Sequence, residues 1–210
     1  MYLSDRDLAW AIENGQLIFD PAPAKIDATS LDLHLGRIDD AKIWDSDQFQ
    51  QDMQDSGNPR PELHVGSYRI GKFGPKYLIS PPGFDGRSSH RAMRRGDEII
   101  VRSLGFLLWP TAEVVGTPKA KADLICFVDG KSTKARTGMV VHLTAPTIHS
   151  TWMGNVTLEI VNLGPFDLVF KEGDAIAQLT VAKITSSPHM GVEGASATYG
   201  QTGVHGKDEK

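Results

Sequence analysis

The richest group of polar side chains in this 210-residue sequence follows an apolar run at residues 124–128. Residues 129–138 read D-G-K-S-T-K-A-R-T-G, so two glycines bracket three cations and two adjacent hydroxyls. Backbone amides, hydroxyls and Lys or Arg side chains together hold phosphate groups through charge-assisted hydrogen bonds. The order is not that of the phosphate loop G-x-x-x-x-G-K-[ST]. On spacing alone, a solvated basic turn is the favoured interpretation, because charged runs are usually exposed.

A single acidic residue, Glu159, interrupts the apolar segment V-T-L-E-I-V at residues 156–161. Strand alternation places Leu158 and Ile160 on one face and Glu159 on the other. A carboxylate in apolar surroundings is costly unless it is paired, hydrogen-bonded or protonated, and such groups are found at proton-transfer sites. An outward-facing strand glutamate fits the pattern equally well, so both interpretations stay open at this point.

The histidines and the single cysteine give no zinc-binding pattern. The seven histidines form no H-E-x-x-H motif, and the H-x-E…P-C-x-x-C pattern of zinc deaminases is absent. Cys126 lies in an apolar run and is expected to be a small buried hydrophobe. His149 could serve as a base, a ligand or a loop histidine, of which the last is the commonest.

Bulk composition narrows the function classes. The net charge is −4 and the pI is about 6.0, which gives no reason to expect a nucleic-acid partner. No apolar stretch has the length of a membrane span, and the N-terminus lacks a signal-peptide core. We therefore expect a cytoplasmic protein with no membrane partner.

Short apolar runs dominate the second half of the chain and predict an all-β fold with a few short helices. A helix capped by Ser4 is expected at the N-terminus, ending near Gly15. Residues 38–95 predict loops and short strands, and 48–60 is the strongest candidate for disorder. Expected strands, separated by turn residues as in a barrel or jelly roll, are 17–19, 30–36, 98–101, 105–109, 122–128, 138–143, 156–161, 166–170 and 175–181.

Five motifs resemble those of dCTP deaminases in the dCTP deaminase / dUTPase superfamily, and they follow one another along the chain in the family's order. Residues 130–138 are similar to the motif G-R-S-S-x-A-R-x-G, and V-H-L-T-A (141–145) with W-M-G-N-V-T-L-E-I (152–160) is similar to the next one. The other matches are L-S-D-R-D (3–7) with S-L-D-L-H-L-G (30–36), G-D-A-I-A-Q-L (173–179) and Y-G-Q-T-G (199–203).

The resemblance implies a distorted jelly-roll (β-clip, dUTPase-like) fold, assembled as a homotrimer with sites between subunits. It implies zinc-independent deamination of dCTP to dUTP, with Mg²⁺ carried on the nucleotide triphosphate. The glutamate matching Glu159 shuttles protons, and the serine matching Ser132 helps to hold the attacking water. The arginine matching Arg136 supports that polar cluster.

The same motifs imply a set of substrate contacts. Lys131 and Thr133 fall where the family contacts phosphates, and the backbone of Ala145 falls where it reads the base edge. The further expected contacts are His149, Trp152, Gln178, Tyr199 and Gln201. Trp152 and Trp109 also fit buried core positions. Besides dCTP, the implied nucleotide partners are dUTP and the inhibitor dTTP.

Three positions depart from the family pattern. His149 stands where the family has the Asp that positions hydrolytic water in dUTPases, which argues against phosphohydrolysis. Lys131 replaces an Arg, so a point charge replaces a bidentate fork. Ala197 and Thr198 stand where deaminases often have a lysine before their tyrosine.

The expected organisation is one deaminase domain at residues 1–185 with an insertion at about 38–95. A glycine-rich tail, 186–210, is expected to close over the nucleotide. Three alternatives to the deaminase remain: a dUTPase-type or bifunctional dCTP deaminase/dUTP diphosphatase, a non-catalytic nucleotide-binding regulatory trimer, and an enzyme with an altered substrate.

Overall fold

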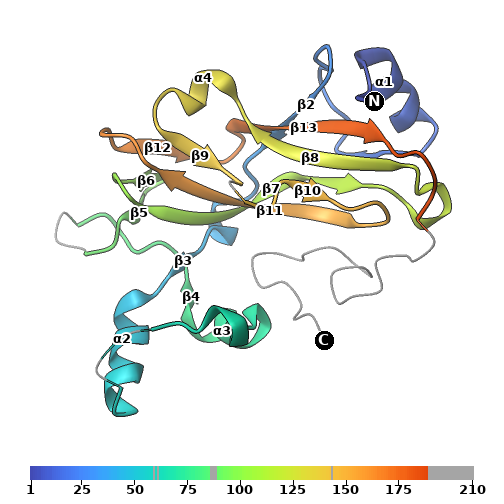
Figure 1. Cartoon of the computed structure of the whole chain (residues 1–210). Coiled ribbons are helices and arrows are strands. Elements are labelled where there is room, and N and C mark those ends of the chain that lie inside the picture. Colours follow the sequence, from blue (N-terminus) through green and yellow to red (C-terminus); the bar gives the residue numbers. More distant parts are fainter. Residues whose placement is uncertain (59, 61, 86–88, 143, 189–210) are drawn as a thin grey trace.

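The computed structural model describes residues 1–58, 60, 62–85, 89–142 and 144–188, and it is rich in β-strands with a few helices (Figure 1). The strands form two four-stranded sheets, ordered β1-β7-β11-β9 and β10-β8-β13-β2, together with a three-stranded sheet β12-β6-β5 and a pair β3-β4. The strands are β1 (Ile18–Asp20), β2 (Leu31–His34), β3 (Ile43–Trp44), β4 (Leu78–Ile79), β5 (Ala92–Arg95), β6 (Glu98–Val101), β7 (Phe106–Gly116), β8 (Leu124–Gly130), β9 (Met139–Val141), β10 (Thr147–Ile148), β11 (Met153–Asn162), β12 (Leu168–Lys171) and β13 (Ala175–Lys183). The helices are α1 (Asp5–Glu13), α2 (Ser46–Asp55), α3 (Ile70–Tyr77) and α4 (Ser132–Ala135), with 3-10 turns at Ile38–Asp40, Val65–Ser67 and Lys119–Lys121.

The two four-stranded sheets lie one above the other and enclose the main core (Figure 1). Every second residue of the long strands points between the sheets, as strand alternation requires. The side chains with 0% exposure there include Leu107, Trp109, Leu158 and Ile160 from one sheet and Leu31, Leu33, Leu179 and Val181 from the other. The prediction of a β-rich sandwich with short helices is thus confirmed.

Helix α1 begins and ends where the sequence predicts. Ser4 and Asp7 form a capping box, in which each side chain accepts a hydrogen bond from the other residue's backbone N–H. The chain leaves the helix through Gly15, whose φ of +61° suits glycine. Leu8 and Ala11 are buried against the core, so α1 covers one flank of the sandwich.

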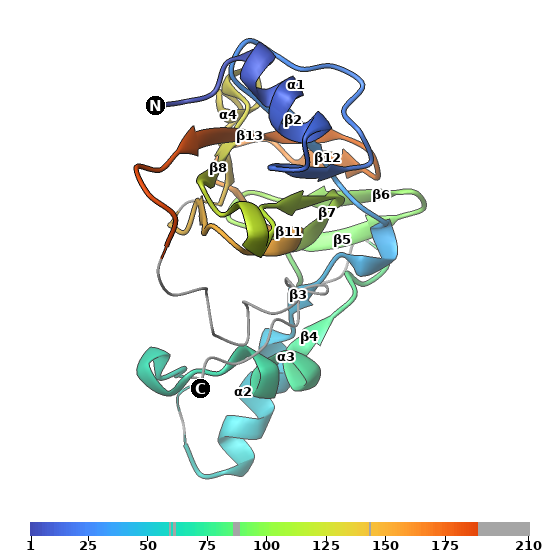
Figure 2. The same cartoon turned by 90° about the vertical axis from the view of Figure 1, so that its right-hand side faces the viewer.

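The prediction of loops and short strands for residues 38–95, with disorder at 48–60, is wrong in part. This segment contains α2 and α3, and both lie beneath the sandwich in the two views (Figures 1 and 2). The ring of Phe49 on α2 meets Tyr77 edge-on at 5.3 Å. Asp52 accepts a hydrogen bond from Tyr77 Oη (2.8 Å) and pairs with Lys76 Nζ (2.6 Å).

Sequence periodicity could not reveal α2, because none of its residues is buried. Its partners are supplied by α3, through ring edges and polar atoms, and the bonded pair Asp52 and Tyr77 are 25 residues apart in the chain. The hydrogen bonds from Lys76, Tyr77 and Gln48 lower the pKa of Asp52 to about 2. Among the described residues, no helix is long and apolar enough to cross a membrane.

Candidate active site

The turn after β8 carries Lys131, Ser132, Thr133 and Arg136 on and around the one-turn helix α4. Ser132, Thr133 and Arg136 are exposed, as a turn predicts. The turn ends at Gly138, where φ is +87° and an added Cβ would lie 2.3 Å from the backbone nitrogen of Gly164. Glycine at this position therefore lets the turn pack directly against the loop after β11.

Lys131 does not behave as a solvated cation of a basic turn. Its ammonium group pairs with the carboxylate of Asp32, and the two side chains are 25% and 32% exposed. Strand register places Asp32, Gln178 and Asp129 opposite one another across β2, β13 and β8. The predicted substrate-binding residues Lys131 and Gln178 thus lie together on one face of the second sheet.

A buried carboxylate fixes the edge strand that carries Asp32. Glu113 of β7 is 4% exposed, and it accepts a hydrogen bond from the backbone N–H of His34 at 2.9 Å. The His34 ring lies 2.6 Å from the same carboxylate through Nδ1. This double contact links β2 to the opposite sheet and so stabilises the position of Asp32. Sequence reasoning missed Glu113, because its partner is 79 residues away.

Two of the expected substrate contacts, Ala145 and His149, lie at opposite ends of β10. The N–H of Val128 donates to the carbonyl of Pro146 at 2.9 Å, so Ala145 lies beside the carboxyl end of β8, near Lys131. His149 lies at the other end and is exposed, with Trp152 N–H donating to its carbonyl at 3.2 Å. Trp152 is partly buried and packs one side against the main core.

Glu159 lies on the outer face of the first sheet, where the alternation predicts it. Leu158 and Ile160 are fully buried between the sheets, whereas Glu159 is half-buried. Its strand neighbour on β7 is Leu108, which packs with Leu78 of β4. Glu159 thus lies beside an apolar cluster that includes a side chain of segment 38–95.

On the other side of Glu159 lies His142, a residue that sequence reasoning did not select. The backbone N–H of His142 donates to the carbonyl of Glu159 at 3.1 Å, and its φ is +57°. Burial lowers the pKa of His142, against the opposing effects of the Glu159 charge and the Ala145 backbone. Its buried Nδ1 has no hydrogen-bond partner among the described residues. The signal that could have found it is its place in V-H-L-T-A, three residues before Ala145.

Within one chain, the turn at Ser132–Arg136 is separated from Glu159. The carbonyl of Gly138 accepts from Leu163 N–H at 2.8 Å, and Met139 pairs with Asn162. Glu159 lies three residues before Asn162 along β11, which at the rise of a strand places it about 10 Å from that pair. The chain therefore presents two separate groups, the turn with Lys131 and the pair Glu159–His142.

A comparison with protein-family models decides which family this arrangement belongs to. The model described as dCTP deaminase-like matches residues 2–184. The chain belongs to this family. The resemblance to dCTP deaminases expected from the motifs is thus confirmed.

Relatives over most of the chain carry the family's name. A dCTP deaminase of Natronomonas pharaonis is 29% identical over 97% of this chain and 92% of its own length. One of Rhodospirillum rubrum is 30% identical over 90% of this chain and 87% of its own length. A protein of Streptomyces griseus named dCTP deaminase, dUMP-forming, is 29% identical over 89% of this chain and 82% of its own length.

A solved structure has a similar fold. The 2′-deoxycytidine 5′-triphosphate deaminase of Agrobacterium tumefaciens superposes with a TM-score of 0.55 at 16% identity. The match covers 87% of this chain and 47% of that one, so this chain spans about half of its length.

Two of the predicted substrate contacts, Tyr199 and Gln201, lie outside the described residues. In the described part of the chain, no group of three or more His, Cys, Asp or Glu residues could hold a metal ion. Cys126 is buried, which raises the pKa of its thiol to about 12, as expected for a core position.

Proposed function

We propose that the protein deaminates dCTP to dUTP and ammonia by direct attack of water, without zinc. One water is consumed, the C4–nitrogen bond of cytosine breaks, and a C4 carbonyl forms. The observation that carries the proposal is the half-buried Glu159 between Leu108 and His142, in a chain of the dCTP deaminase-like family. A carboxylate so placed can take a proton from water and return it to the ring nitrogen and the leaving amine.

The remaining residues take roles that follow from their chemistry. Ser132 holds the attacking water, and Arg136 supports that polar cluster. Lys131 and Thr133 bind phosphate oxygens, with Mg²⁺ carried on the triphosphate. The further substrate contacts proposed are the backbone of Ala145 and the side chains of His149, Trp152, Gln178, Tyr199 and Gln201.

We further propose that a complete site forms between chains of a homotrimer. Glu159 and the turn at 132–136 are separated within one chain, and this supports a site in which one subunit supplies the turn and its neighbour supplies the glutamate. Residues 1–185 would form the deaminase domain, with 38–95 as its insertion. The tail 186–210 would close over the bound nucleotide.

A second candidate is a bifunctional enzyme that also releases diphosphate. The dUMP-forming name of the Streptomyces griseus relative favours it. His149 opposes it, because an imidazole replaces the carboxylate that would position hydrolytic water. We therefore place deamination alone first.

Product analysis separates the candidates. The purified chain is incubated with dCTP and Mg²⁺, and the nucleotides are resolved by chromatography. We expect dUTP with little dUMP. Appearance of dUMP would favour the bifunctional enzyme, and survival of dCTP despite measurable binding would favour a non-catalytic regulatory trimer or an altered substrate. His149→Asp tests the same position, since a gain of dUMP would show that the histidine blocks hydrolysis.

A further inference from the structure

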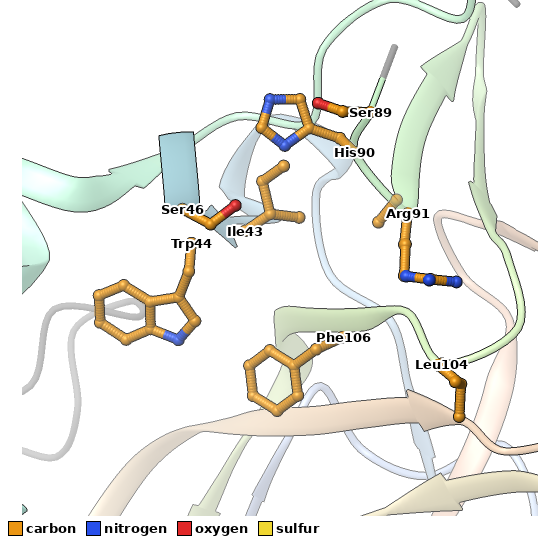
Figure 3. Close-up of a pocket in the computed structure, with 9 residues that line it drawn as sticks. Ile43, Trp44, Ser46, Ser89, His90, Arg91, Leu104 and Phe106 are labelled. Carbon is orange, nitrogen blue, oxygen red and sulfur yellow. The ribbon is translucent and has the colours of Figure 1, made fainter. Parts of the chain in front are cut away.

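A cavity of about 250 Å³ lies where the insertion meets the core (Figure 3). Trp44, Ser46, His90 and Arg91 all come from the insertion, and Phe106 begins β7. Phe106 pairs with Val161, two residues along β11 from Glu159, and points to the same face of the sheet. The cavity therefore adjoins the face of the sheet that carries Glu159, and among the described residues that line it none belongs to the turn that carries Lys131.

The polar lining of this cavity favours an anion. Among the described residues that line it, the charged or ionisable side chains are Arg91 and His90, and none is an Asp or Glu. The guanidinium of Arg91 is anchored, because Nη1 donates to the carbonyl of Ser103 at 2.7 Å. A guanidinium has five N–H donors, so the group anchored through Nη1 keeps other donors for a ligand. Their planar arrangement suits a carboxylate or a phosphate.

The apolar lining favours a flat ring. In Figure 3 the Trp44 and Phe106 rings lie at the lower left, with His90 above them and Arg91 to the right. The Trp44 ring is held by an edge contact to Tyr68 at 6.3 Å. Phe106 is 37% exposed although it begins a core strand. Two such rings provide stacking surfaces for an aromatic ligand.

Backbone strain at the rim is consistent with a functional position. Leu104 lines the cavity and has a φ of +62°, a region that bulky side chains rarely adopt. Its side chain is 65% exposed, so burial of this leucine does not compensate for the strain. Strained residues of this kind concentrate at binding sites.

We propose that this cavity binds a small planar aromatic anion, with its ring against Trp44 and Phe106 and its acidic group at Arg91 and His90. The volume suits one ring with one acidic group and is too small to enclose a nucleoside triphosphate. The ligand is thus either an aromatic phosphate ester or an aromatic carboxylate. This site goes beyond the proposed deamination and does not depend on it.

The test is calorimetric titration of the full chain with phenyl phosphate and, separately, with benzoate. Phenol and inorganic phosphate are the controls that lack one half of the ligand. We expect at least one anion to bind and both controls to bind about ten-fold more weakly or worse. Binding of phenyl phosphate alone identifies a phosphate ester as the ligand class, and binding of benzoate alone identifies a carboxylate.

Matched variants locate the binding. Arg91→Gln and Trp44→Leu are each expected to weaken it about ten-fold or more. Arg6→Gln and Trp10→Leu change the same residue types on α1 and should bind like the wild type. Phe106→Leu replaces Trp44→Leu if circular dichroism shows that the latter is unfolded.

Three results would overturn the proposal: no binding of either anion, equal binding by Arg91→Gln, or loss of binding in Lys131→Gln. The last would mean that the probe occupies the nucleotide site. Deamination of dCTP is assayed in parallel, so a failure of the proposed function is recorded separately from a failure of this site.

Discussion

In the sandwich, alternate side chains of two sheets are withdrawn completely from water, and Trp109 and Leu158 are both 0% exposed. In the segment 38–95, proposed as an insertion, the two helices meet through the edges of aromatic rings and through the ion pair of Asp52 with Lys76. This difference in packing indicates that the sandwich and the segment 38–95 have different roles. The sandwich fixes the strands that carry the proposed catalytic residues, and the insertion shapes the surface around them.

The largest expected effect belongs to a residue fixed by the sandwich. Glu159→Gln keeps the shape of the side chain but removes its proton-transfer capacity. We expect kcat for dCTP deamination to fall about 10²- to 10⁴-fold while nucleotide binding is retained. Glu13→Gln, an exposed change on α1, is the matched control and should leave both unchanged. Normal turnover by Glu159→Gln would remove this residue from the mechanism.

Stability measurements sharpen the same comparison. Trp109→Ala should cost about 3–5 kcal/mol of unfolding free energy, because it empties a fully buried site. Phe49→Ala should cost about 1 kcal/mol, since it removes one ring contact in a half-buried position. Urea unfolding monitored by circular dichroism gives both values. Equal losses would mean that the insertion is as integral to the core as the sandwich itself.

A smaller effect is expected for acid stability of the insertion. Asp52 has a lowered pKa, of about 2, so its ion pair stabilises the fold above the ordinary carboxyl pKa. This contribution is lost as the pH falls from about 4 towards 2, because the carboxylate is protonated there. Thermal melts of Asp52→Asn should therefore differ from the wild type less at pH 2 than at pH 6. Asp55→Asn, on the same helix and bonded to Gln51, is the control.

The sequence predicts a structural feature correctly where all the residues that determine it lie in one short segment. The alternation around Glu159 predicted its face correctly, and the four letters from Ser4 to Asp7 predicted the start of α1. It fails to predict a side chain's surroundings where the residue that contacts it is far away in the sequence. Lys131 was interpreted as a solvated cation because Asp32, its partner, comes 99 residues earlier.

The missed features share this cause. Helix α2 depends on α3, and the buried Glu113 depends on His34. His142 becomes notable only when the strands place it beside Glu159. Pairings across the sheets have no local signature, so a single sequence without a family resemblance could not have joined these residues into one site.

The central claim is that Glu159 of one chain and Ser132 of another complete a single site. Its most direct test is co-expression of Glu159→Gln with Ser132→Ala, each of which is expected to be inactive as a homotrimer. Random assembly combines an intact turn and an intact glutamate in about a quarter of the sites. Recovery of about a quarter of the wild-type dCTP deamination rate is the predicted result. A mixture as inactive as the separate variants would contradict the account.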